Sequence, residues 1–132
     1  MIHEEICTYE VCKLAKEKGF PQHIGNDAYI VENEYDDEYE VGCCYPIPFI
    51  PDYLPTITAP TQSLLQRWLR EEKGIHILVE YEWVEGIDDW TFYAYIKKVN
   101  NAKVVDDAIK SGFNTYELAL EDALAYSLKK LI

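Results

Sequence analysis

The sequence predicts an α+β fold in which two β-hairpins form an antiparallel sheet of about four strands, packed against about four helices. Apolar residues recur at helical spacing in several stretches, and two pairs of stretches alternate polar and apolar residues as strands do. Most of the prolines lie in one segment between the two halves of the chain. The expected order is helix, hairpin, extended arm, helix, hairpin, helix, helix, with helices covering mostly one sheet face.

The chain has the size of one ordinary domain. Its 132 residues are 48% hydrophobic and 14% aromatic, which supplies enough apolar side chain for an interior. We therefore expect a single domain over 1–132 that contains three segments. A helix and an acidic hairpin occupy 1–45, a proline-rich arm follows over 46–60, and a helix–hairpin–helix–helix unit fills 61–132.

The first segment begins with a helix and continues into a hairpin. Thr8 is a suitable N-cap for a helix that runs to Lys18, and Gly19 stands in the stop position. The β-prone stretch 28–32 and the alternating stretch 38–43 predict the two strands of the hairpin.

The proline-rich arm holds five of the six prolines, between Pro46 and Pro60. Each proline fixes φ and lacks an amide donor, which excludes a helix or a central strand here. The interleaved Ile, Phe, Tyr and Leu residues are too apolar for a solvated linker. We expect an extended arm that lies across an apolar surface of this protein or of a partner.

Three helices are expected in the main unit. The first ends at Gly74 and the last begins near Asn114 or Thr115 and continues for about four turns. Between them, a short helix over 103–110 would bury its apolar stripe of Val104, Val105, Ala108 and Ile109.

The hairpin of the main unit shows the most regular pattern in the chain. Residues 75–84 and 90–98 alternate as strands, and 85–89 have the composition of a turn. One side of the first strand is expected to carry Ile75, Ile77, Val79, Tyr81 and Trp83. The other side carries His76, Leu78, Glu80 and Glu82.

The charge balance narrows the classes of partner. The chain carries 24 acidic and 12 basic residues, a formal net charge of −12, and the excess acid lies in the first third. This balance repels phosphate backbones and anionic lipids, so we expect no direct nucleic-acid binding and no membrane binding. No apolar run approaches the ~20 residues that span a bilayer, and no signal peptide is recognisable, so we expect a cytoplasmic protein.

Catalytic and metal-binding patterns are not evident in the sequence. Cys7, Cys12, Cys43 and Cys44 lack the spacing of a zinc site and are expected to be reduced thiols. His76 could pair with Glu80 or Glu82 as a general base, but an exposed strand histidine is more often simply solvated. We therefore expect no catalytic residue, no metal and no cofactor.

An acidic run is the first candidate interaction site. It comprises Glu32, Glu34, Asp36, Asp37, Glu38 and Glu40. A solvated hairpin tip, with Asp36 and Asp37 in the turn, is the simplest explanation. A calcium loop would need a central glycine that the run lacks. A surface that mimics nucleic-acid phosphates is the remaining alternative.

A tyrosine-bearing strand face is the second candidate. Tyr93 and Tyr95 are expected to share a face with Leu78, Glu80 and Glu82 of the neighbouring strand. An uncovered face of this composition is typical of protein interfaces. Coverage by the first hairpin or by the proline-rich arm would make it core, and we favour coverage.

The chain also resembles a group of small proteins of gut Bacteroidetes and their phages or integrated elements. The resemblance lies in residues 59–71 (APTQSLLQRWLRE), 75–77 and 115–120, and at the N-terminus in 8–11 and 14–20. It covers about the first 20 residues and 59–132. The resemblance implies an accessory role in a mobile element and transfers no site residues.

The sequence thus favours a non-enzymatic interaction protein that binds a protein partner, or itself as a homodimer, through the tyrosine face and the acidic hairpin. An inhibitor that mimics nucleic acid and blocks a nuclease or DNA-binding protein is the first alternative. A small-molecule binder or enzyme with a pocket between sheet and helices is the second.

Overall fold

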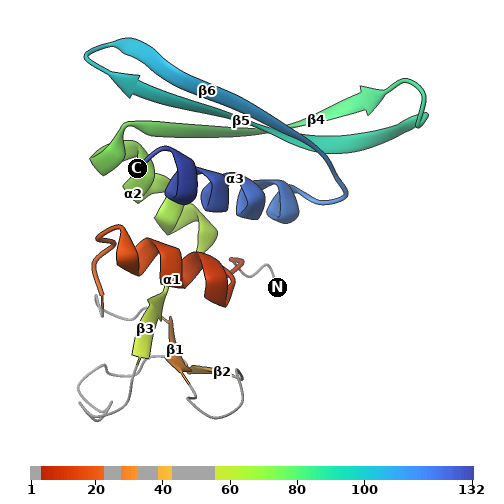
Figure 1. Ribbon diagram of the computed structural model, residues 1–132. Helices are drawn as coiled ribbons and strands as arrows, with labels where there is room; N and C mark the ends of the chain where they lie inside the picture. Colours follow the sequence, from red (N-terminus) through yellow and green to blue (C-terminus); the bar gives the residue numbers. More distant parts are fainter. Residues whose placement is uncertain (1–3, 23–27, 33–38, 43–55) are drawn as a thin grey trace. The chain divides into compact units, whose positions relative to one another are not determined.

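The computed structural model describes residues 4–22, 28–32, 39–42 and 56–132. Helices and antiparallel sheets occur together in this part of the chain, so the predicted α+β class is confirmed. The chain divides into two compact units, Met1–Thr61 and Gln62–Ile132 (Figure 1).

In the first unit, helix α1 (Tyr9–Glu17) begins where the sequence predicts. The Thr8 side chain accepts a hydrogen bond from the amide of Val11, as an N-cap does. Val11, Cys12 and Ala15 form the buried face of α1, which packs on a neighbouring strand of the same unit. The helix therefore forms from a capped, amphipathic stretch whose apolar side has a partner.

A three-stranded sheet completes the described part of this unit, in the order β2-β1-β3. Strands β1 (Ala28–Glu32) and β2 (Tyr39–Gly42) pair antiparallel, which confirms the predicted hairpin. Its turn, with Asp36 and Asp37, lies outside the described residues. Strand β3 (Thr56–Ala59) pairs antiparallel with the other side of β1.

The prediction of an extended arm over 46–60 is corrected at its end, because Thr56–Ala59 is a strand. This proline-free window between Pro55 and Pro60 is rich in β-branched residues, which favour strands. Strand β3 stands last in the order of its sheet, so the exclusion of a central strand is consistent with the structure. Residues 46–55 lie outside the described part.

The second unit consists of helix α2 (Gln62–Lys73), three strands and helix α3 (Tyr116–Lys130). Strands β4 (Ile75–Val84), β5 (Asp89–Asn100) and β6 (Lys103–Phe113) form an antiparallel sheet in sequence order. Figure 1 shows both helices on one face of this sheet. The buried core between helices and sheet includes Leu65, Leu69, Ile75, Ile77, Ala94, Ile96, Leu124 and Leu128.

Polar contacts tie α2 to its neighbours within this unit. The buried amide of Gln62 donates to the carbonyl oxygen of Glu117 (3.0 Å) and to the carboxylate of Glu121 (2.7 Å), both on α3. The amide of Gln66 donates to the carbonyl oxygen of Ile77 on β4 (2.9 Å). These contacts fix the start of α2 against α3 and its middle against β4.

No helix in the part of the chain that the structure describes is long and apolar enough to cross a membrane.

The predicted helix over 103–110 is wrong, because these residues belong to β6. Val104 and Val105 lose side-chain freedom in a helix and favour a strand, and the long strand β5 offers a free edge to pair with. Tyr95 stands opposite Ile109 in that pairing, and Ile96 stands opposite Ala108. Val104, Val105 and Ile109 are exposed rather than buried. The predicted single sheet of two hairpins is thus replaced, among the described residues, by two three-stranded sheets.

A two-residue turn at Asn101 and Ala102 connects β5 to β6. Both residues have positive φ, 50° and 62°, as the tight turns of hairpins require. Alanine is strained in this conformation by about 1 kcal/mol.

We expect Ala102→Gly to raise the free energy of unfolding by about 0.5–1 kcal/mol, because glycine adopts positive φ without strain. Ala108→Gly, inside β6, should lower it by a similar amount, because glycine weakens a strand interior. Urea denaturation of both variants measures the two effects. Destabilisation by Ala102→Gly would contradict the turn.

The junction between α2 and β4 depends on Gly74. Its φ is +67°, and a Cβ at this position would lie 2.5 Å from the carbonyl oxygen of Val99. The amide of Val99 donates to the carbonyl oxygen of Gly74 (2.8 Å), so the two backbones are held in close approach.

Gly74→Ala should therefore lower the free energy of unfolding by about 2–4 kcal/mol, from backbone strain and a backbone clash together. Gly86→Ala is the matched control, because Gly86 also has positive φ (+100°) but nothing within 4 Å of its Cβ position. The control should lose only about 1–2 kcal/mol. Equal losses in thermal or urea unfolding would contradict the close approach.

Candidate protein-interaction surface

The sheet of the second unit has one face packed against α2 and α3 and one face turned away from them. Ile75, Ile77, Ala94 and Ile96 are buried on the packed face. Side chains alternate along a strand, so the intervening residues lie on the opposite face, which we call the open face. From β4 and β5 the open face includes His76, Leu78, Glu80, Glu82, Thr91, Tyr93, Tyr95 and Lys97.

An apolar row crosses all three strands at the centre of the open face. Leu78 of β4 stands opposite Tyr95 of β5, which stands opposite Ile109 of β6. Leu78 is 54% exposed and Ile109 65% exposed, while Tyr95 between them is half-buried. Within Gln62–Ile132, both helices pack on the other face, so no element of this unit covers the row.

Charged residues flank the apolar row on both sides. Glu80 and Tyr93 form the next pair on this face, and His76 and Lys97 form the pair on the other side of the row. Lys97 also stands opposite Asp107 of β6. The result is an apolar centre between polar rows, an arrangement typical of protein interfaces.

Tyr95 is held in place by two polar neighbours. Its hydroxyl donates to Oδ2 of Asp107 (3.3 Å), and Nζ of Lys97 lies 5.0 Å from the centre of its ring. Desolvation raises the pKa of Tyr95 above 10.0, and the charge of Asp107 and the hydrogen bond to it raise this pKa further. The phenol therefore presents a neutral ring of fixed orientation at the centre of the open face.

We expect Asp107→Asn to lower the pKa of Tyr95, because a neutral amide no longer repels the tyrosinate. The pKa should stay above 10.0, since desolvation remains. NMR titration of a sample labelled at the tyrosine ring carbons measures it. Asp106→Asn is the matched control, because Asp106 stands opposite Lys98 rather than Lys97. An unchanged pKa in Asp107→Asn would contradict the contact.

A second exposed group lies at the free end of the β4–β5 hairpin. We call Tyr81, Trp83, Trp90, Phe92 and Tyr116 the aromatic ridge. The ring of Tyr81 stacks on Phe92 (centroids 4.6 Å apart) and lies 4.9 Å from Trp90. Trp83 meets Trp90 edge-on at 5.9 Å, and Tyr116 of α3 meets Phe92 edge-on at 6.4 Å. Trp83 and Trp90 are 48% and 49% exposed.

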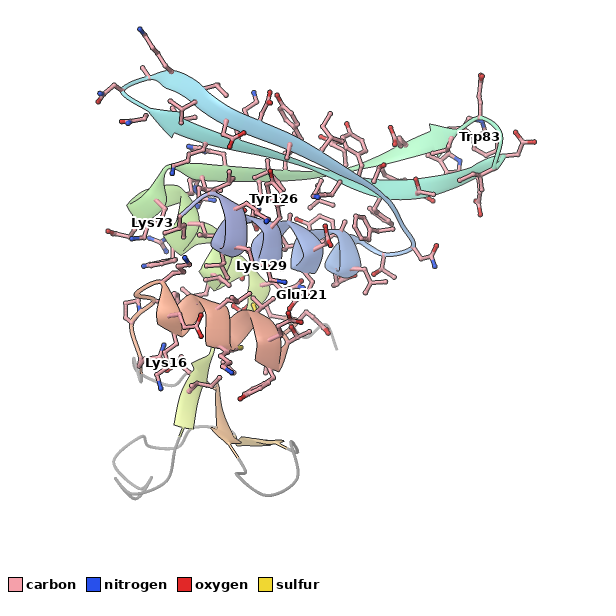
Figure 2. All side chains as sticks on the ribbon, viewed as in Figure 1. Lys16, Lys73, Trp83, Glu121, Tyr126 and Lys129 are labelled. Atoms are coloured by element: carbon pink, nitrogen blue, oxygen red, sulfur yellow. The ribbon has the colours of Figure 1, made fainter. Side chains whose placement is uncertain are left out.

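The exposure of this ridge is not predicted by the alternation of the sequence. Alternation predicts Tyr81 and Trp83 on the same side as Ile75 and Ile77, and the structure places all four on the face that carries the helices. The side is right, but the helices end first: Phe92 is the last position at which β6 pairs with β5, and the hairpin continues beyond it. Figure 1 shows the hairpin extending past α3, and Figure 2 shows Trp83 near its free end.

The structure brings together only some of the residues predicted to interact. Glu80, Glu82, Tyr93 and Tyr95 share the open face, as alternation predicts. Four of the acidic-run residues, Glu34, Asp36, Asp37 and Glu38, lie outside the described residues.

The remaining two residues of the run stand on paired strands of the first unit. In the register, Glu32 is opposite Tyr39 and Glu40 is opposite Val31, so these two acids are not partners of each other. A phosphate-like row of carboxylates on this hairpin stays a prediction.

Two of the four cysteines that are expected to be reduced lie in the described part of the chain. Cys7 and Cys12 are buried, neither is part of a disulfide, and Sγ of Cys12 donates to the carbonyl oxygen of Cys7 (3.5 Å). In residues 4–22, 28–32, 39–42 and 56–132, no three His, Cys, Asp or Glu side chains are grouped closely enough to hold a metal ion. His76 is exposed on the open face.

Comparisons with protein-family models, with curated proteins and with solved structures find no match to this chain.

Proposed function

We propose that this protein is a non-enzymatic interaction protein that binds a protein partner through the open face. It acts in the cytoplasm as an accessory protein of a phage or mobile element. The mobile-element role is supported by the resemblance of residues 59–71 and 115–120 to proteins of such elements. A cytoplasmic location agrees with Cys7 and Cys12 being buried thiols outside any disulfide.

The exposed apolar row of Leu78, Tyr95 and Ile109 is the observation that carries the proposal. Isolated exposed apolar residues are ordinary, but here three neighbouring strands present one each at the same register position. Tyr95 lies at the centre of this row, and tyrosine is enriched among the interface residues that contribute most of the binding energy. The ring of Tyr95 is already oriented by Asp107 and Lys97, so little side-chain freedom is lost on binding.

The charges beside the row indicate a cationic partner. Glu80, Glu82 and Asp107 contribute three carboxylates near the row, while Lys97 contributes one ammonium. The net charge of −12 extends this field over the protein and favours encounter with basic surfaces. A second copy of the chain would bring the same carboxylates to the interface, so a homodimer is disfavoured.

Leu78→Ser tests the proposal, and Leu118→Ser is a closely matched control. Both leucines belong to the second unit and are 54% and 53% exposed, but Leu118 lies on α3. Both variants should keep the wild-type melting temperature within a few degrees, because exposed substitutions change stability little. Any difference in binding then reports on the open face.

Affinity capture from Bacteroidetes cells with the wild type and both variants should identify a protein whose recovery falls with Leu78→Ser alone. That protein, purified, should bind the wild type and Leu118→Ser equally and Leu78→Ser about tenfold or more weakly, measured by calorimetry. The proposal fails if no captured protein depends on Leu78. It also fails if light scattering shows a dimer that Leu78→Ser dissociates.

A further inference from the structure

The aromatic ridge is a second surface without a partner in its own unit. Its five rings form a continuous series, Trp83 to Trp90 to Tyr81 to Phe92 to Tyr116, with successive centroids 5.9, 4.9, 4.6 and 6.4 Å apart. The ridge lies on the face of the sheet opposite to the open face, because Tyr81 and Phe92 alternate with Glu80 and Tyr93.

Stabilisation of the hairpin explains only part of the ridge. Beyond Phe92 the sheet has two strands, and a two-stranded ribbon is marginal in water without cross-strand contacts. The pairing of Trp83 with Trp90 and of Tyr81 with Phe92 supplies these contacts. Each of Tyr81, Trp83, Trp90 and Tyr116 still has two fifths or more of its surface exposed. Those surfaces are free to bind.

The charges around the ridge have one sign. Residues 80–93 contain five carboxylates and no lysine, arginine or histidine: Glu85, Asp88 and Asp89 lie in or beside the turn of the hairpin, and Glu80 and Glu82 lie on the opposite face of the two-stranded ribbon. Residues 114–122, which begin α3 beside the ridge, contain three more carboxylates and no basic residue. The ridge therefore lies in a negative field over distances of about one Debye length, roughly 8 Å in physiological salt.

Other aromatic rings of the same unit already have a cation over them. Nζ of Lys73 lies 5.3 Å from the centre of Trp68, and Nζ of Lys110 lies 4.5 Å from the centre of Tyr126. In the described part of the chain, no lysine or arginine lies over any ring of the ridge. The electron-rich faces of two tryptophans and two tyrosines are thus available to an external cation.

We propose that the aromatic ridge binds a segment of another protein that presents arginine side chains. A guanidinium group is planar, stacks on tryptophan and tyrosine faces, and pairs with carboxylates, so it matches both features of the ridge. Nucleic acids and other anions are repelled by the field of the carboxylates in residues 80–93 and 114–122, where no basic residue opposes them. A second copy of the ridge would be repelled for the same reason. This site goes beyond the proposed function of the open face and does not depend on it.

Two peptides of equal charge test the site on the full-length protein. One is an acetylated and amidated (Arg-Gly)4 peptide, and the other is the corresponding (Lys-Gly)4 peptide. The arginine peptide should bind about threefold or more tightly than the lysine peptide, because only arginine stacks. The arginine peptide should also change the fluorescence of Trp83 and Trp90, and higher salt should weaken its binding. Calorimetry and fluorescence titration measure these effects.

Trp83→Ala should weaken binding of the arginine peptide about three- to tenfold and should reduce the preference for the arginine peptide over the lysine peptide. The paired Trp83 and Trp90 should give an exciton signal in far-ultraviolet circular dichroism that reports a folded hairpin end. Trp83→Ala removes this signal, so a second variant is needed to separate lost binding from an unfolded hairpin end. Tyr116→Ala leaves β4 and β5 unchanged, should keep that exciton signal, and should weaken binding about threefold. Leu78→Ser, on the open face, should bind the peptide as the wild type does.

If the two peptides bind with equal affinity, and neither Trp83→Ala nor Tyr116→Ala changes that affinity, binding is due to charge attraction alone and the proposal is overturned. Tighter binding of single-stranded DNA than of the arginine peptide would also overturn it. Dimerisation that Trp83→Ala abolishes would identify a second copy as the occupant and would refute an arginine-bearing partner. Failure of the Leu78 experiment leaves this test unaffected, since the two surfaces lie on opposite faces.

Discussion

In the second unit, the strands are longer than the helices, and this difference in length decides how much of the sheet the helices cover. Strand β5 has 12 residues and spans about 40 Å, whereas α3 has 15 residues and spans about 22 Å. Helices of this length bury Ile75, Ile77, Ala94 and Ile96 but cannot reach the end of the hairpin. The exposure of Tyr81 and Trp83 follows from this constraint, because the helices end before them, whereas the open face is exposed because both helices pack on the other face.

The exposed hairpin end is compatible with a stable unit because its rings pack on one another. Trp83, Trp90, Tyr81 and Phe92 make cross-strand contacts where β6 no longer supplies a third strand. At the packed end of the same sheet, Gly74 and Val99 are held in close approach, and the two hydrogen bonds of Gln62 fix the start of α2 against α3. The unit therefore combines a dense core at one end with a protruding aromatic ribbon at the other.

Two kinds of local pattern predicted their elements correctly: the strict alternation of polar and apolar residues in a strand, and a residue suited to cap the start of a helix. Thr8 caps α1, 28–32 and 39–42 pair as a hairpin, and β4 follows the alternation of 75–84. Residues 103–110 were predicted wrongly because Val104, Val105, Ala108 and Ile109 fit a helical stripe as well as a strand. What decided between them is a partner: β5 has an unpaired edge, and pairing with it satisfies the backbone of β6. No local pattern contains that information.

The sequence by itself determined the α+β class, the acidic balance, and the shared face of Glu80, Glu82, Tyr93 and Tyr95, because these depend on composition and on alternation along one hairpin. Only the tertiary structure decided which face the helices cover, that Ile109 of β6 completes the row of Leu78 and Tyr95, and that Tyr81 and Trp83 stay exposed. Coverage depends on where elements distant in sequence end relative to one another. Periodicity assigns a side chain to a face, and packing decides whether that face meets protein or water.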